Sequence, residues 1–433
     1  MVDKPTVLIA GGGVGGLALA HGLLKQGMAV RLFERHPGGS PAGYRLHMNG
    51  DGGTALESLL PPELFELYLD TSRTDPFRER LVFLDRRLRR LGSRPHLGAV
   101  ITHRRKDTAV NRTTLRQVLL HGLDDVVVQG DVVSYQEDAD GVEVTLSDGR
   151  RERGDILVGF DGLHSRIRAQ RLPEARVVEL PLTGIYGRTP LPRELEVSLP
   201  HDLLDGFVLV MGPQLLDGGV LAMGAFTPRV DVEHAAAARG IDAHLSPAEP
   251  YMMLGAGIPP AVWTQIDADP ATASPTQMKA ALQALVQGWH PHVVDMVDRA
   301  RPEDLFTTRL RYVQAPDTWT PSRVTLAGDA VHAMPPTLGV GANLALRDAQ
   351  VLADALRTWQ ATPGGSVIDA IGAYEQEMRG YAFPLVQRAI TQEGSASGFT
   401  PIGLIRLVRM VGAGRIARAT RTRKQSVGDS ARA

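Results

Sequence analysis

A glycine-rich turn between an apolar segment and a helical segment constrains the fold of this chain most strongly. Residues 6–10 are apolar, residues 11–16 read Gly-Gly-Gly-Val-Gly-Gly, and a second apolar segment at 30–33 ends at an acid. This spacing predicts a βαβ unit whose glycines let backbone N–H groups approach a pyrophosphate at the helix N-terminus. The acid, about 20 positions further on, suits a ribose hydroxyl. By itself, the unit leaves NAD and FAD open. The expected dinucleotide contacts are Gly11, Gly13, Val14, Gly15, Gly16 and Glu34.

A second strand–loop–helix pattern lies far along the chain, at residues 323–356. The apolar run 324–327 stops at Gly328-Asp329, and Pro335-Pro336 favours extended backbone. Two glycines follow, which permit close approach of backbone to a ligand. From Asn343 onward, apolar residues recur at helical spacing. Because a helix N-terminus carries partial positive charge, this end is suited to hold negative charge on a bound ring system.

This second pattern resembles the second FAD-binding signature of the aromatic-hydroxylase (group A) flavoprotein monooxygenases. That family includes para-hydroxybenzoate hydroxylase and the tetracycline-inactivating monooxygenases. The resemblance favours FAD over NAD as the bound dinucleotide. It implies that the aspartate bonds the ribityl chain and that the helix beginning near residue 341 points at the pyrimidine end of the flavin. The alternative is an ordinary strand–loop–helix with a chance Gly-Asp turn. The matching or expected contact residues are Gly328, Asp329, Pro336, Gly339, Gly341, Ala342, Asn343 and Asp348-Ala349.

Other segments match the same family between these two patterns. Residues 161–168 resemble its D-G-x-x-S-x-x-R signature, with Asp161, Ser165 and Arg168 in place and Phe160 where a small residue is usual. In relatives this signature serves both FAD and the nicotinamide cofactor. The predicted helix 112–123 carries Arg112 and, one helical turn later, Arg116. The alternative to a cofactor contact by these arginines is simple exposure to solvent. Contacts with the adenosine or pyrophosphate half of FAD are expected by resemblance from Arg35, Arg45, Arg112 and, through its backbone, Val133. For Arg45, a solvent-exposed surface arginine is the alternative.

The pattern changes at about residue 180, where strand-like segments follow one another. By resemblance, this region is the mostly antiparallel sheet that covers the flavin and builds the substrate pocket. The predicted fold is therefore α/β, a Rossmann-like FAD-binding domain interleaved with an antiparallel substrate domain, plus C-terminal helices. Pocket candidates are Tyr186, Met211, Met223, Phe226 and Pro335, and core packing is the alternative for the members from the sheet. The predicted segments are 1–75, 106–178 and 276–365 for FAD, 76–105 and 179–275 for substrate, 366–424 for C-terminal helices, and 425–433 for a disordered tail.

Composition limits the remaining possibilities for this 433-residue chain. Lys and Arg number 47 against 48 Asp and Glu, so charge gives no reason to expect nucleic acid as a partner. The absence of cysteine excludes disulfides and a cysteinyl-flavin bond.

No apolar run reaches the roughly 18–20 residues of a membrane span, so a cytoplasmic protein without stable membrane insertion is expected. His290-Pro291-His292 lacks a third ligand at a suitable spacing, so no metal site is expected. The basic segment 402–423 is expected to dock on its own protein, with membrane-surface binding as the alternative.

The expected activity follows from the resemblance. FAD would be reduced by NAD(P)H acting as a transient reductant, because the chain has a single G-x-G-x-x-G. Capture of O₂ as a flavin C4a-hydroperoxide would then hydroxylate an electron-rich small molecule, aromatic or polycyclic. No catalytic side chain is expected, and His332 is interpreted as structural. A flavoprotein oxidase or dehydrogenase and a non-redox FAD-binding protein are the alternatives. The identity of the substrate, the preferred nicotinamide and the oligomeric state stay open.

Overall fold

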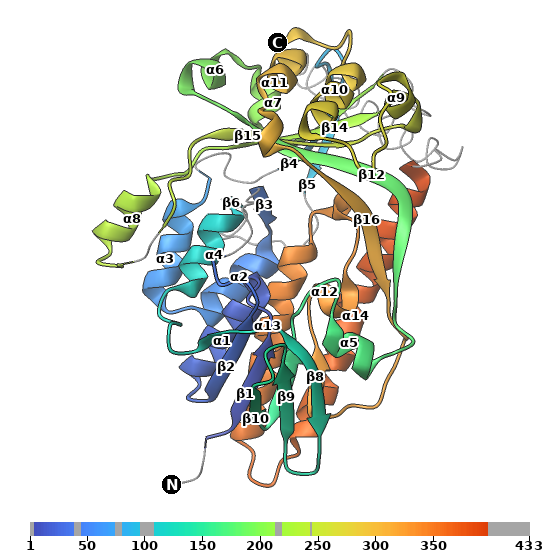
Figure 1. Cartoon of the computed structure of the whole chain (residues 1–433). Helices are drawn as coiled ribbons and strands as arrows, with labels where there is room; N and C mark the ends of the chain where they lie inside the picture. The colour runs from blue at the N-terminus through green and yellow to red at the C-terminus, as the bar shows by residue number, and fades with distance from the viewer. Residues whose placement is uncertain are drawn as a thin grey trace, which may run out of the picture.

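The computed structural model describes residues 4–38, 45–73, 80–95, 108–212, 219–242 and 245–396. These residues form two bodies, connected by the long strands β12 (Arg176–Pro190) and β16 (Phe306–Gln314) (Figure 1). The lower body in Figure 1 is a parallel sheet covered by helices, and the upper body is a mostly antiparallel sheet with helices on its outer side. The predicted α/β class with a Rossmann-like domain and a second sheet is confirmed.

A five-stranded parallel sheet lies at the centre of the lower body. Its order is β17–β11–β1–β2–β7, and every neighbouring pair is parallel. The first strand is apolar along its length and almost completely buried, because a parallel sheet is covered on both faces. The carboxyl ends of β17, β11 and β1 therefore meet at one edge, the edge where open α/β sheets bind ligands. The bounds are β1 Thr6–Ala10, β2 Ala29–Glu34, β7 Val127–Gln129, β11 Ile156–Gly159 and β17 Val324–Leu326.

Helices distant in sequence pack together around this sheet. The first helix, α1 (Val14–Lys25), packs against α13 (Gly341–Gln360), which also contacts α2 (Gly50–Leu59) and α14 (Val367–Ala396). Within the predicted C-terminal helical segment 366–424, the structure has the continuous α14 with Pro384 inside it. Burial explains why the proline does not end the helix, since Met378, Ala382, Val386 and Ala389 form one buried helical face that continues past it. The other elements here are α3 Pro62–Thr71, α4 Arg112–Leu120, α5 Arg166–Arg171, α8 Val232–Ala238, α12 Asp329–His332 and the 3₁₀ turn η2 Pro336–Leu338.

The upper body is a seven-stranded sheet in the order β16–β12–β15–β14–β13–β4–β5. Its pairs are antiparallel except β13 with β4, which is parallel. In β13, Val208 and Val210 are buried under the outer helices, whereas Phe207 and Leu209 on the opposite face are half-buried. The half-buried face turns toward the lower body (Figure 1). The remaining bounds are β4 Arg80–Asp85, β5 Arg90–Pro95, β13 Gly206–Met211, β14 Val220–Phe226, β15 Tyr251–Gly257, α6 Arg193–Ser198, α7 His201–Leu204, α9 Pro260–Gln265, α10 Pro275–Leu285, α11 Pro291–Arg299 and η1 Pro302–Asp304.

The predicted boundary at residue 276 between the two domains differs from the one that the packing shows. The segment 276–365 was expected to belong with the FAD-binding domain, yet α10 and α11 share a buried core with the seven-stranded sheet, and β16 pairs with β12. The upper body therefore extends to residue 314. Two small sheets complete the described chain: β3 (Arg45–Met48) with β6 (Thr108–Asn111), and β8 (Val132–Glu137) with β9 (Val142–Leu146) and β10 (Arg151–Gly154). No helix within the described ranges is long and apolar enough to cross a membrane. The predicted 402–423 helix lies outside those ranges.

Candidate functional site

The glycine-rich turn after β1 is built by backbone packing. Gly11 has a φ of +113°, and a Cβ there would lie 2.3 Å from the carbonyl oxygen of Phe160 at the end of β11. A Cβ on Gly16 would lie 2.2 Å from the carbonyl oxygen of Gly11. At Gly13, the N-cap of α1, a Cβ would meet nothing within 4 Å. The turn is thus closed on its inner side and open at the helix N-terminus, where unpaired N–H groups suit an anion.

Glu34 and Arg116 hold the loop beside this turn. The Glu34 carboxylate accepts hydrogen bonds from the backbone N–H groups of Gly12 and His36, both at 2.7 Å. Arg116 donates from Nε to the carbonyl of Gly12 at 3.0 Å and from Nη1 to that of Pro37 at 2.7 Å. The predicted Arg112, one turn earlier on α4, is exposed. Sequence reasoning recognised the shared face of the two arginines but missed the structural role of the second.

The Gly-Asp turn after β17 lies two strands away at the same sheet edge. Gly328 has a φ of +59°, and its N–H donates to Asp348 Oδ2 at 2.7 Å. Asp329 begins α12 with an exposed side chain, whereas the next three residues are buried. Gly339 is left-handed at the end of η2, and space is open around it and around Gly341, the first residue of α13. An exposed carboxylate and an open helix N-terminus therefore lie in one connected stretch of chain.

Phe160 links the two glycine motifs. A Cβ on Gly15 would lie 2.6 Å from Phe160 Cε1, and one on Gly328 would lie 3.3 Å from Phe160 Cδ1. The ring thus fills the space between the α1 N-terminus and the Gly-Asp turn. The aromatic residue found in place of the usual small one changes local packing in this way.

The Asp161 signature connects β11 to α12. Asp161 Oδ2 accepts hydrogen bonds from the backbone N–H groups of Arg166 at 2.8 Å and Ile167 at 3.2 Å. Burial nevertheless raises the pKa of Asp161 above its ordinary value. Arg168, 5% exposed, donates from Nη1 to the carbonyl of Ala330 and from Nη2 to that of Leu163, both at 2.8 Å. Arg168 was recognised as part of the signature, but its bond to α12 is visible only in three dimensions.

Several predicted cofactor residues have other contacts in this structure. Arg45 is buried and donates from Nε to the carbonyl of Ala225 in β14 at 3.0 Å. Arg35 lies 3.9 Å from Asp131 and is exposed. Val133 lies at a register shift in β8, so its backbone departs from the regular ladder there. Cofactor binding by these residues stays a prediction.

Asn343 also bonds within the protein. Its Oδ1 accepts from Asn49 N–H at 2.9 Å, and its Nδ2 donates to the carbonyl of His47 at 2.8 Å. The side chain therefore joins the start of α13 to the connection between β3 and α2. A ligand contact at Asn343 would therefore come from its backbone, and the same holds for the preceding Ala342.

The pocket candidates separate onto different sides of the upper sheet. Tyr186 stacks on Phe306, with ring centroids 6.0 Å apart, and Met211 lies half-buried on the face that turns toward the lower body. Phe226 is fully buried against Tyr251, with centroids 5.3 Å apart. Met223 is fully buried in the helix-covered core on the outer side. Met223 and Phe226 are therefore core residues, the alternative that the sequence left open, and Pro335 is buried just before η2.

A buried polar network lies behind the Gly-Asp turn. His332 Nε2 lies 2.6 Å from Asp348 Oδ2, and both side chains are fully buried. Burial alone would lower the pKa of His332, but the Asp348 carboxylate outweighs it and raises that pKa above the ordinary value. His332 is thus interpreted as structural. Asp348, which the sequence showed only as part of the signature, contacts both His332 and the backbone N–H of Gly328. His290 and His292 stack at the start of α11, and no group of metal-binding side chains occurs among the described residues.

The geometry fits FAD. Open space surrounds Gly13, Gly339 and Gly341, the side chain of Asp329 is exposed among buried neighbours, and two helix N-termini meet at the sheet edge. These features offer backbone donors for a pyrophosphate, an acceptor for hydroxyl groups, and a positive helix end for a ring that gains electrons.

Comparisons with known proteins point to the same cofactor. A family model described as "FAD binding domain" matches residues 229–389. The chain is 28% identical over 402 residues to the dual O-methyltransferase/FAD-dependent monooxygenase CTB3 of Cercospora beticola, covering 87% of this chain and 44% of that protein. It therefore spans less than half the length of this curated relative.

Solved structures of similar proteins also point to FAD as the cofactor. A protein of Photorhabdus luminescens subsp. laumondii TTO1, assigned as an FAD-containing monooxygenase, is 27% identical with a TM-score of 0.75, covering 91% of this chain and 99% of that one. HpxO of Klebsiella pneumoniae, solved with FAD and uric acid, shares the fold at 19% identity and a TM-score of 0.72, covering 96% and 95%. The resemblance to FAD-dependent monooxygenases and FAD as the cofactor are confirmed, and the predicted enzyme class is that of these relatives.

Proposed function

We propose that the chain is an NAD(P)H- and O₂-dependent FAD monooxygenase that hydroxylates an electron-rich aromatic or polycyclic small molecule. The observation that carries this proposal is the convergence of the glycine-rich turn, the Asp161 signature and the Gly-Asp turn on adjacent strand ends. The antiparallel sheet that turns its half-buried face toward this edge supports a substrate site beside the flavin. The chain has a single glycine-rich dinucleotide motif, so the nicotinamide would bind transiently at the flavin.

FAD, when bound, supplies the redox and oxygen-transfer chemistry, and the protein supplies position and electrostatics. In this proposal, the open N-terminus of α1 at Gly13 holds the pyrophosphate and Glu34 the ribose. Asp329 accepts hydrogen bonds from the ribityl hydroxyl groups. The α13 N-terminus, at Gly341, stabilises negative charge on the reduced ring.

The substrate would lie against the half-buried face of the upper sheet. The Tyr186 ring lies over Gly184 of its own strand β12 and Gly255 of the neighbouring β15, since a Cβ on either glycine would come close to the ring, at 2.9 and 3.0 Å. Phe207 and Met211 are half-buried on the same face. Aromatic rings and a flexible thioether favour flat apolar molecules through stacking and sulfur–aromatic contacts.

The test is an anaerobic titration of the FAD-loaded protein with NADPH and then NADH, with and without a panel of aromatic candidates. We expect the flavin absorbance to bleach with a nicotinamide, faster when a suitable aromatic is present. Admission of ¹⁸O₂ should then place one labelled oxygen atom in the product. Bleaching by the aromatic alone would identify an oxidase or dehydrogenase instead, and a flavin that neither nicotinamide reduces would contradict the proposal.

A further inference from the structure

Three polar side chains of α14 form hydrogen bonds near the Gly-Asp turn, two with β17 and one with Asp348 of α13. Glu375 accepts a hydrogen bond from Thr325 Oγ1 at 2.8 Å, and Tyr374 donates to the carbonyl of Leu326 at 2.9 Å. Further along the same helix, Tyr381 donates to Asp348 Oδ1 at 2.6 Å. The first two contacts hold the strand itself, whereas the third reaches the Gly-Asp turn through another side chain.

Asp348 is the junction between Tyr381 and that turn. Its Oδ1 accepts the Tyr381 hydroxyl, while its Oδ2 accepts Gly328 N–H at 2.7 Å and contacts His332 Nε2 at 2.6 Å. The carboxylate is fully buried, so it depends on these donors instead of water. Gly328 immediately precedes Asp329, and His332 ends the short helix α12 that Asp329 begins. The orientation of the carboxylate thus fixes both ends of the segment that carries Asp329.

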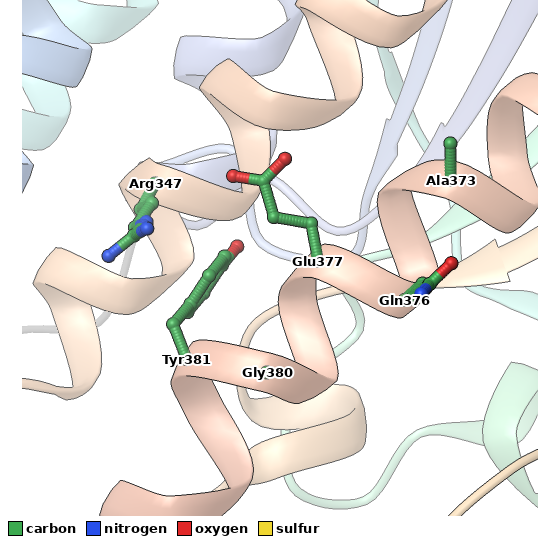
Figure 2. A pocket seen from close by; sticks show the side chains of 6 residues that line it. All are labelled: Arg347, Ala373, Gln376, Glu377, Gly380 and Tyr381. Carbon is green, nitrogen blue, oxygen red and sulfur yellow. The ribbon is translucent and has the colours of Figure 1, made fainter.

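Tyr381 is itself held at the protein surface. It lines a shallow groove between α13 and α14 together with Arg347 and Glu377 (Figure 2). The Arg347 guanidinium lies 3.9 Å above the centre of the Tyr381 ring, a cation–π contact, and 3.7 Å from Asp51 of α2. The Tyr381 ring is therefore fixed between a surface cation and a buried acceptor.

We propose that Tyr381 is a positioning residue for FAD: it orients Asp348, which in turn sets the Gly328–Asp329 turn that would receive the ribityl chain. This inference rests on the FAD site of the proposed function and adds a residue about 50 positions beyond it in sequence, on a different helix. Nothing in the sequence around Tyr381 indicates this role, because the contact joins two helices through a third element.

The test compares Tyr381→Phe with Tyr374→Phe. Both variants lose one hydrogen-bonded hydroxyl from the same helix, but only the first loses a hydrogen bond to Asp348. We expect Tyr381→Phe to weaken FAD binding on the order of tenfold, the size of one hydrogen bond to a charged acceptor. Its bound flavin should also have an altered visible spectrum and a shifted midpoint potential. We expect Tyr374→Phe to lower the melting temperature while retaining wild-type affinity, spectrum and potential.

Arg347→Lys provides a second variant that leaves the interior intact. Lysine keeps the positive charge but loses planar stacking on the ring, so a severalfold loss of FAD affinity in the same direction is expected. Wild-type affinity and potential in both Tyr381→Phe and Arg347→Lys would overturn the inference, as would equal losses in Tyr381→Phe and Tyr374→Phe. These measurements need no substrate turnover, so they can fail while the proposed oxygenation holds. A wild-type protein that takes up no FAD would overturn both.

Discussion

The glycine-rich turn after β1 and the Gly-Asp turn after β17 lie at one sheet edge but are held in different ways. Backbone contacts shape the first, where Gly11 and Gly16 pack so closely that a Cβ would collide with carbonyl oxygens. Side chains from other elements hold the second: the buried Asp348 from α13 and Arg168 from α5 and, through Asp348, the half-buried Tyr381 from α14. Backbone packing therefore shapes the first turn, and side chains from three other helices hold the second.

This difference predicts how each turn responds to change. The first turn should tolerate no added atom on its inner side, whereas loss of a distant side chain such as Arg116 should loosen only the loop beside it. The second should accept local change on its exposed side, yet should fail when any member of its buried network is altered. The variants below test this contrast in order of decreasing effect.

We expect the largest effect from Gly16→Ala. Its Cβ would lie 2.2 Å from the carbonyl oxygen of Gly11, so the turn or α1 must shift. The free energy of unfolding should fall by about 4 kcal/mol or more, as for severe overpacking at a constrained site. Urea unfolding of the FAD-free protein, followed by circular dichroism, measures the loss.

Gly13→Ala is the matched control in the same turn. Its Cβ would meet no atom within 4 Å, so stability without FAD should stay within about 0.5 kcal/mol of wild type. FAD affinity should nevertheless fall, because the added methyl occupies the surface where backbone must approach the pyrophosphate. Similar unfolding curves for Gly13→Ala and Gly16→Ala would contradict the assignment of closed and open sides.

Asp348→Asn should come next. The carboxylate uses both oxygens, one for Gly328 N–H and His332 and the other for the Tyr381 hydroxyl. An amide has only one oxygen, so at least one of these contacts is lost. Breaking one partner of a buried pair should cost about 3 kcal/mol, and FAD affinity should fall as the Gly-Asp turn loosens. The same urea unfolding and an FAD titration measure both losses. Loss of stability with unchanged affinity would show that the network supports the fold and not the turn.

A pH dependence should follow from the same network. The folded-state pKa of His332 is raised above 6.5, so the folded protein binds this proton more tightly than the unfolded chain. The stabilisation is therefore fully present below pH 6.5 and is lost as pH rises through the folded-state value. Unfolding free energies between pH 5.5 and 9 should show this decline, and His332→Asn should remove it. A decline that persists unchanged in His332→Asn would assign it to another group.

The two regions also show what could be predicted from the sequence. The glycine-rich turn, its flanking strands and Glu34 could be predicted because the glycines, the apolar segments and the acid that make up the motif lie within 30 residues. For the Gly-Asp turn, the motif was recognisable, but the bonds from Arg168 and Tyr381 were not, because they join residues more than 30 positions apart. Met223 illustrates a third limit: alternation along β14 gives two faces, and only the helices packed on one of them decide which is the core.

The smallest effect is expected from Arg112→Ala, compared with Arg116→Ala. Arg112 is exposed at the start of α4, so its removal should change stability by less than about 0.5 kcal/mol. Arg116 bonds the carbonyls of Gly12 and Pro37, so its removal should destabilise the loop beside the glycine-rich turn by about 1–2 kcal/mol. Titration with FAD separates stability from cofactor contact. If Arg112 reaches the bound cofactor, its variant should bind FAD several times more weakly despite its unchanged stability. Wild-type affinity in Arg112→Ala would remove this arginine from the site and leave Arg116, acting through the loop, as the arginine of α4 that matters to this turn.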